Sequence, residues 1–309
     1  MSVARVVIGT RGSALARWQA DHVAAELGRL HAGLQVELKI IVTEGDRFQA
    51  GPVIELGGKG VWVKEIEAGL LEGSIDLAVH SLKDVPATLA PGLTLAAIPP
   101  RADARDVLVS RDGSSLAALP AGSRVGTSSL RRVCQVRALR SDLRVEVLRG
   151  NVDTRLRKIA EGVVDAGILA AAGLDRLGLG ARITERLSAE AMLPAIGQGA
   201  LAIETRADDA RVVGLCRALS SPDAEATAAA ERALLAGLGV GCRTPVGGHA
   251  TLDGDTLVLR GLVGRPDASE MLREEVRGPR ASAADLGAAL AARLLARGAD
   301  RILAELENA

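Results

Sequence analysis

Aromatic side chains are almost absent from this chain of 309 residues, which has two tryptophans, one phenylalanine and no tyrosine. The hydrophobic core must therefore be built from aliphatic side chains. Proteins that bind single-stranded nucleic acids stack the bases on aromatic rings, so the shortage argues against a surface of that kind.

Cysteine is also scarce, and its three residues, Cys134, Cys216 and Cys242, lie far apart in the sequence. This spacing fits neither a disulfide framework nor a zinc site. No apolar run is long enough to cross a bilayer, and the N-terminal segment leads into an expected strand without a signal-peptide pattern. We therefore expect a cytoplasmic protein with no bound metal and no membrane partner.

The remaining composition, 48% hydrophobic and 25% charged, is typical of a folded globular protein, and the length suggests two or three domains. The net charge is zero, yet residues 124–158 hold ten basic and three acidic residues, a local charge of +7. Most of these arginines are best interpreted as a solvated helix face with a few ion pairs. A nucleic-acid binder is an alternative, which the neutral chain disfavours and salt-dependent binding to DNA or RNA would favour.

Short apolar runs alternate with helical patterns, which is typical of βαβ units. Strands are expected at 3–8, 36–42, 75–79, 105–109, 124–126, 145–148, 165–170 and 201–204. Helices are expected from a cap at Ser13 to about residue 30, and at 63–71, 130–140 and 154–161. From residue 221 the pattern changes to an alanine-rich helix to about 236, strands at 257–263 and 272–276 and a helix at 283–297, which indicates a small α+β domain.

Arginines stand where expected strands end. Arg131 and Arg132 follow the turn of residues 126–129, while Arg149 ends one strand and Arg155 lies early in the next helix. Ligands of open α/β sheets bind at the carboxyl ends of strands, and helix N-termini favour anions. Because the guanidinium group suits carboxylates and phosphates, we predict a polyanionic ligand.

Two glycine-rich turns have the composition of anion-binding sites. The turn Gly9-Thr-Arg-Gly-Ser13 could hold a carboxylate, but it lacks the third glycine of a dinucleotide fingerprint. Residues 57–60, Gly-Gly-Lys-Gly, are followed by valine, so they do not form the phosphate loop of an NTPase. We interpret this second segment, which contains Lys59, as a mobile loop.

Two further segments carry reactive side chains. Residues 80–86, His-Ser-Leu-Lys-Asp-Val-Pro, close a buried strand; alone, Lys83 and Asp84 would more simply form a surface ion pair, and His80 would be a core histidine with a partner. Cys242 lies in a loop rich in glycine and proline, where Arg243 would favour the thiolate. The alternative for Cys242 is an inert, small apolar residue.

Together these segments resemble the porphobilinogen deaminase family, also called hydroxymethylbilane synthases. The resemblance rests on residues 57–60, 78–86, 125–132, 148–152, 193–199 and the loop of Cys242, in this order over nearly the whole chain. It implies a transferase of heme and other tetrapyrrole biosynthesis that joins four porphobilinogen molecules head to tail into hydroxymethylbilane and releases ammonia. It also implies a dipyrromethane cofactor, attached to Cys242 by a thioether. Porphobilinogen carries two carboxylates, which agrees with the arginine clusters.

The resemblance further implies an α/β fold with two periplasmic-binding-protein-like domains, a site in the cleft between them and a small C-terminal α+β domain that carries the cofactor. The expected domains are residues 1–99 with 200–217, 100–199 and 218–309. A monomer that hands its product to uroporphyrinogen-III synthase is expected.

Functional residues follow from the matching motifs. Asp84 is the expected catalytic carboxylate, because a fixed carboxylate can hydrogen-bond the pyrrole N–H, stabilise the cation left when ammonia departs and move protons. The cofactor residues are expected to be Cys242, Lys83, Ser81, Thr127, Ser128, Ser129, Arg131 and Arg132. The substrate residues are expected to be Arg11, Ser13, Gln19, Arg149, Arg155 and Arg176, and those of the mobile loop are Lys59 and Trp62.

The chain departs from the family pattern at a few positions. Trp62 stands where the family usually has phenylalanine, Glu44 replaces a more usual basic residue, and Arg243-Thr244 follows the cysteine in place of Gln-Val or Gln-Ile. A solute-binding or effector-sensing protein remains an alternative, since it could share the architecture and the anion-binding turns. Such a protein would carry no adduct on Cys242.

Overall fold

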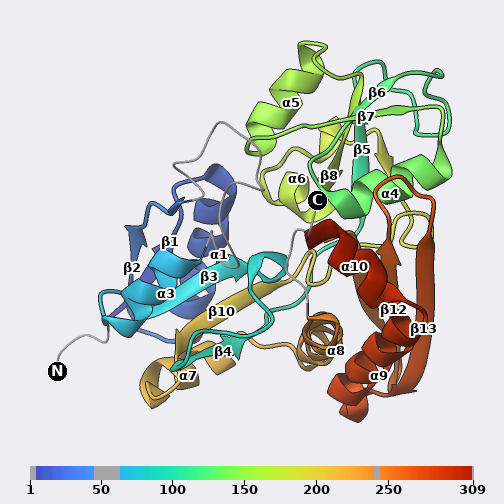
Figure 1. Cartoon of the computed structure of the whole chain (residues 1–309). Helices are drawn as coiled ribbons and strands as arrows, with labels where there is room; N and C mark the ends of the chain where they lie inside the picture. Colours follow the sequence, from blue (N-terminus) through green and yellow to red (C-terminus); the bar gives the residue numbers. More distant parts are fainter. Residues whose placement is uncertain (1–4, 45–62, 240–243, 308–309) are drawn as a thin grey trace. The chain divides into compact units, whose positions relative to one another are not determined.

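The computed structural model describes residues 5–44, 63–239 and 244–307. The chain groups into two compact units, Met1–Arg101 with Ala200–Glu225, and Ala102–Gly199 with Ala226–Ala309. Figure 1 shows the elements of both units. Three sheets organise them, and helices pack against the strands of each sheet.

The sheet of the first unit has the order β2-β1-β3-β10-β4. Its strands are β1 (Arg5–Thr10), β2 (Gln35–Ile40), β3 (Leu77–Ser81), β4 (Leu93–Ala97) and β10 (Leu201–Arg206). Strands β2 and β3 pair parallel to β1, whereas β10 pairs antiparallel to both β3 and β4. The helices are α1 (Ala14–Leu30), α3 (Lys64–Leu71) and α7 (Ala210–Arg217). Parallel pairing brings the carboxyl ends of β1 and β3 to one edge.

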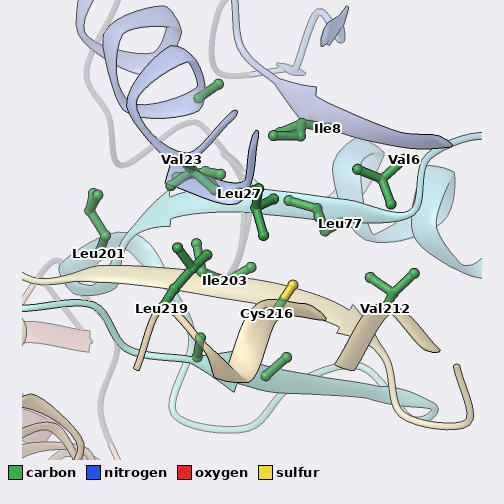
Figure 2. Packing of buried hydrophobic residues seen from close by; sticks show 14 residues of the cluster. Val6, Ile8, Val23, Leu27, Leu77, Leu201, Ile203, Val212, Cys216 and Leu219 are labelled. Atoms are coloured by element: carbon green, nitrogen blue, oxygen red, sulfur yellow. The ribbon is translucent and has the colours of Figure 1, made fainter. Parts of the chain in front are cut away.

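An aliphatic core holds this unit together, as the shortage of aromatic residues predicts. Figure 2 shows Ile8, Leu27, Leu77 and Ile203 from β1, α1, β3 and β10 packed into one cluster with Cys216 of α7. Every one of these side chains is buried.

The second unit repeats the same sheet plan in the order β7-β6-β8-β5-β9. Its strands are β5 (Asp106–Ser110), β6 (Arg124–Gly126), β7 (Arg144–Glu146), β8 (Ala166–Ala170) and β9 (Glu185–Arg186), with helices α4 (Leu130–Leu139), α5 (Val152–Ala160) and α6 (Ala171–Arg176). Strands β7 and β8 run parallel to β6, while β5 runs antiparallel to β8 and β9.

The C-terminal part of the second unit has an antiparallel sheet, β11-β12-β13. It comprises β11 (Val246–Asp253), β12 (Thr256–Gly264) and β13 (Met271–Pro279), with helices α9 (Ala283–Ala296) and α10 (Ala299–Glu307). Helix α8 (Pro222–Leu238) belongs to this unit from Ala226 onward. The two five-stranded sheets and this small sheet confirm the predicted fold class. The three-domain boundaries remain a prediction.

Several elements differ from the sequence expectation. Strand β3 lies two residues later than expected, β7 is shorter, and β4, α6, α7, β9, β11 and α10 were not predicted. The Ser13 cap is confirmed, because its Oγ accepts a hydrogen bond from the Ala16 N–H at 3.3 Å. Within the described ranges, no helix has the length and apolar character needed to cross a membrane.

Candidate active site

The predicted residues of the first unit gather where β1 and β3 end. Arg11, Ser13, Gln19, Ser81 and Asp84 line one pocket in this unit. The parallel pairing of the two strands explains the arrangement, because residues that follow β1 and residues that follow β3 reach the same sheet edge. The pocket thus combines a guanidinium group, three polar side chains and a carboxylate.

Local contacts fix the walls of this pocket. The Gln19 amide, on α1, donates a hydrogen bond to Ser81 Oγ at 2.9 Å. Asp84 ends a short 3-10 turn, Leu82–Asp84; the first residue of the turn, Leu82, and the residue after it, Val85, are both buried. Buried residues on both sides therefore anchor the turn and leave the half-buried Asp84 at the pocket.

His80 has the partner expected of a core histidine. Its side chain is 6% exposed, and its Nε2 lies 3.0 Å from Glu204 Oε2 on the neighbouring strand β10. The interpretation of His80 as a satisfied core residue is confirmed, although the ring also borders the pocket.

The predicted residues of the second unit follow β6, β7 and β8. Thr127 is buried and its Oγ1 accepts a hydrogen bond from the Ser129 N–H at 3.2 Å, while Ser128 is exposed. Arg155 donates from Nε to the Gly150 carbonyl at 2.7 Å. Arg176, at the end of α6, donates to the Gly199 carbonyl at 2.8 Å, and burial lowers the pKa of its guanidinium group to about 10.

Arg131 and Arg132 are buried on a shared carboxylate, Asp106, at the start of β5. Arg131 donates to Asp106 Oδ2 at 2.7 Å, and Arg132 donates to Oδ1 from Nε at 3.0 Å and from Nη2 at 2.7 Å. Arg132 also donates to the Ile168 carbonyl at 2.9 Å. Their position after a strand end predicts an external anionic ligand and no partner within the protein; their packing against an internal carboxylate is a finding of the structure.

The charge of this cluster is not balanced. Burial alone would raise the pKa of Asp106, but the two guanidinium groups outweigh that effect and hold its pKa well below the usual range. Two cations and one anion leave a net charge of +1. Arg131 Nε is moreover buried and has no hydrogen-bond partner among the described residues. An excess cation with an unused donor fits a further carboxylate, such as those that dipyrromethane carries.

Other arginines of the basic segment form ordinary ion pairs. Arg140 contacts Asp142 at 2.7 Å and Arg157 contacts Glu161 at 3.0 Å. Arg124 contacts Asp165 at 3.0 Å. These pairs confirm the simple interpretation for this part of the cluster, and exposed pairs of this kind contribute little to stability.

Asp106 and Gln198 are not among the site residues expected from the sequence. Gln198 is buried and donates from its amide to Asp106 Oδ1 at 2.9 Å and to the Ala104 carbonyl at 2.7 Å. The sequence signal that points to Asp106 is a carboxylate at the first position of an apolar strand. Gln198 lies within the motif of residues 193–199, so its position was noted although its role was not.

Two of the three cysteines belong to the core. Cys134 and Cys216 are buried free thiols, and burial raises their pKa to about 11 and about 12. Figure 2 shows the Cys216 sulfur among aliphatic side chains. Cys242, Lys59 and Trp62 lie outside the described residues. Among the described residues no group of three or more His, Cys, Asp or Glu side chains is arranged to hold a metal ion.

Cys134 and Cys216 should resist alkylation in the folded protein. At pH 8 their pKa values leave about 10⁻³ and 10⁻⁴ of each thiol ionised, and both are shielded by packing. Iodoacetamide treatment followed by peptide mass spectrometry should find both unmodified before denaturation and alkylated after it. Rapid modification of either residue in native buffer would contradict their assignment to the core.

The fold and the site define an α/β protein that has arginines and one pocket carboxylate at the ends of its parallel strands. Residues 6–214 match the family model described as "Porphobilinogen deaminase, dipyromethane cofactor binding domain", and residues 226–296 match "Porphobilinogen deaminase, C-terminal domain". The chain belongs to the porphobilinogen deaminase family.

Curated relatives cover nearly the whole chain. A porphobilinogen deaminase of Syntrophotalea carbinolica is 52% identical over 99% of this chain and 98% of its own length. One from Syntrophobacter fumaroxidans is 51% identical over 98% of each chain. Among solved structures, a periplasmic aliphatic sulphonate binding protein of Escherichia coli is 17% identical, with a TM-score of 0.39 over 76% of this chain and 75% of that protein.

Proposed function

We propose that this family member condenses four porphobilinogen molecules head to tail into the linear tetrapyrrole hydroxymethylbilane and releases one ammonia at each condensation. The observation that carries the proposal is the pocket in which Arg11 and Asp84 lie together. The substrate needs both groups, because its acetate and propionate are anionic whereas its pyrrole ring becomes cationic during reaction. Arg11 with Ser13 would bind a carboxylate, and Asp84 would face the ring.

Asp84 is proposed to be the catalytic residue. Loss of ammonia from the substrate's aminomethyl group leaves positive charge spread over the ring and its nitrogen. A carboxylate held by the buried neighbours Leu82 and Val85 can accept a hydrogen bond from that N–H and stabilise the charge. It can also accept a proton when the new carbon–carbon bond has formed.

Residues of both units are proposed to bind the carboxylates of the growing chain. Ser81 ends β3 and Lys83 follows it, while Thr127, Ser128 and Ser129 follow β6. Together with Arg131 and Arg132 they would hold the dipyrromethane cofactor. Arg11, Ser13, Gln19, Arg149, Arg155 and Arg176 would bind the substrate carboxylates.

Cys242 is the proposed attachment point of the cofactor. When bound, dipyrromethane supplies a primer with a nucleophilic pyrrole carbon. The burial and raised pKa of Cys134 and Cys216 support this assignment, since a thioether-forming cysteine must be accessible and ionisable. The net positive charge of the Asp106 cluster supports a carboxylate-bearing group in the second unit.

Intact mass and product analysis test this function. Purified protein should be heavier than its 31.8 kDa sequence by one dipyrromethane and should colour with an aldehyde reagent for pyrroles. It should release four ammonia molecules for each hydroxymethylbilane formed. Cys242→Ser should lose the added mass, the colour and the activity, and Cys216→Ser should lose none of them. An active protein with unmodified mass would refute the covalent cofactor.

The resemblance also leads us to propose that the enzyme works in the cytoplasm as a monomer and passes its product to a uroporphyrinogen-III synthase. The chemistry supports a downstream consumer, because a linear tetrapyrrole with a terminal hydroxymethyl group remains reactive until it is cyclised. Sedimentation velocity measures the oligomeric state, and co-sedimentation with the synthase measures the hand-over.

A further inference from the structure

The turn of residues 195–199 connects several parts of the second unit. Its backbone is tight: Gly197 and Gly199 have φ values of +73° and +87°, and Gln198 N donates to the Ala195 carbonyl at 2.9 Å. A Cβ atom at Gly199 would lie 2.6 Å from the Ala102 carbonyl oxygen, so no larger residue fits there. The turn therefore holds one conformation against the irregular segment, residues 102–104, that leads into β5.

The side chain of Gln198 contacts Asp106, the carboxylate that binds Arg131 and Arg132. Its amide nitrogen donates to Asp106 Oδ1, the same oxygen that accepts two hydrogen bonds from Arg132, and also to the Ala104 carbonyl. Gln198 and Asp106 are 1% and 0% exposed. The amide therefore helps to fix where the carboxylate lies, and through it the two guanidinium groups.

The turn itself is held by Glu231 of α8. This buried carboxylate accepts a hydrogen bond from Gly197 N at 2.6 Å through Oε2 and one from Ala250 N of β11 at 2.7 Å through Oε1. Helix α8 ends at Leu238, four residues before Cys242. Glu231 thus links α8 to the turn that carries Gln198. In the sequence, α8 is the helix that precedes the proposed cofactor thiol.

We propose that Gln198 is a positioning residue for cofactor assembly, and that Glu231 holds it in place from α8. The chain of contacts runs from Glu231 through the turn to Gln198, then to Asp106 and on to Arg131 and Arg132. This inference rests on the proposed function, since it assumes that the arginine pair binds the cofactor carboxylates. Gln198 acts through Asp106 and touches neither substrate nor cofactor.

Gln198→Met tests the proposal, because methionine fills a similar volume but has no donor for Asp106 or Ala104. Apo-protein made in cells that lack porphobilinogen is mixed with porphobilinogen, and intact mass follows the gain of dipyrromethane over time. Because a hydrogen bond to a charged group is lost, assembly should slow by about 10-fold or more relative to wild type. Once loaded, the variant should retain most of its kcat.

Leu290→Ala is the matched control. Leu290 is buried on α9 in the same unit, where it lies beside Gly261 of β12, and α9 packs on β12 and β13. It should lower the melting temperature at least as much as Gln198→Met while it keeps the wild-type assembly rate. Wild-type assembly in Gln198→Met overturns the proposal, and so does an equal slowing in both variants, because the loss would then track stability.

Glu231→Gln is a second test of the proposal, for use if Gln198→Met does not fold. It replaces one of the two accepting oxygens with an amide N–H that faces a backbone N–H, so the turn should loosen and assembly should slow by about threefold or more. An unchanged assembly rate would overturn the link through α8. If wild-type apo-protein gains no mass from porphobilinogen, the proposed function fails. If wild type, Gln198→Met and Glu231→Gln all gain mass at the same rate, only the positioning role of Gln198 and Glu231 is rejected.

Discussion

Arg132→Leu is expected to yield protein without cofactor and without activity. The guanidinium group of Arg132 makes three of the hydrogen bonds around Asp106 and Ile168, so its removal leaves Asp106 and the Ile168 carbonyl short of donors in the core. Loss of one partner from a buried ion pair costs about 3–5 kcal/mol. The excess positive charge of the cluster also disappears. Intact mass and thermal melting measure the two consequences.

Arg149→Leu is the control for that experiment. Arg149 is half-buried and precedes α5, apart from the Asp106 cluster. We expect Arg149→Leu to melt within a few degrees of wild type and to carry dipyrromethane, yet to stall after fewer than four condensations, which mass spectrometry shows as trapped intermediates. Normal turnover in both variants would mean that these arginines bind neither cofactor nor substrate.

Both strand-end turns of the first unit are recognisable in the sequence, but only the resemblance to the family assigns Arg11 and Asp84 to one site. Once β1 and β3 are parallel neighbours, residues 11–13 and 81–84 must reach one sheet edge, and Arg11 and Asp84 line one pocket. The Ser13 cap was predictable from the sequence, since capping is a contact between residues three apart.

The role of Asp106 could not be predicted in this way. In the sequence Arg105 is its nearest cation, but Arg105 instead contacts Asp103 at 2.8 Å, and Asp106 reaches arginines 25 and 26 residues away. Hydrophobic periodicity predicts which face of a strand is buried. It does not predict which side chain, distant in the sequence, packs against that face. The partner of a buried charge depends on tertiary packing.

Strand β11 shows a second limit. Its first residues, Val246-Gly-Gly-His249, are typical of a loop, so no strand was predicted there. The structure gives a packing reason for the glycine, since a Cβ atom at Gly248 would lie 2.6 Å from Ile196 Cγ1. Close approach to the 195–199 turn therefore favours glycine inside a strand, against the local propensity.

Asp84→Asn is expected to lower the rate of tetrapyrrole formation by about 10²–10⁴-fold, the range for loss of a positioned acid–base group. Asparagine keeps the shape of the side chain but removes the charge that would stabilise the substrate cation and accept its proton, and the lost charge stabilisation can lower the rate further. The buried residues Leu82 and Val85 still anchor the turn, so the variant should fold. Single-turnover assays on protein of confirmed cofactor content measure the effect.

Asp84→Glu separates charge from position. Glutamate restores the negative charge but moves it by about one carbon–carbon bond, so we expect this variant to retain more activity than Asp84→Asn and less than wild type. If Asp84 were only a surface charge beside Lys83, both variants would react at nearly the wild-type rate, because exposed ion pairs contribute little. Near-normal turnover of cofactor-loaded Asp84→Asn would therefore show that Asp84 takes no part in the mechanism. The arginines of the site would then act only in binding.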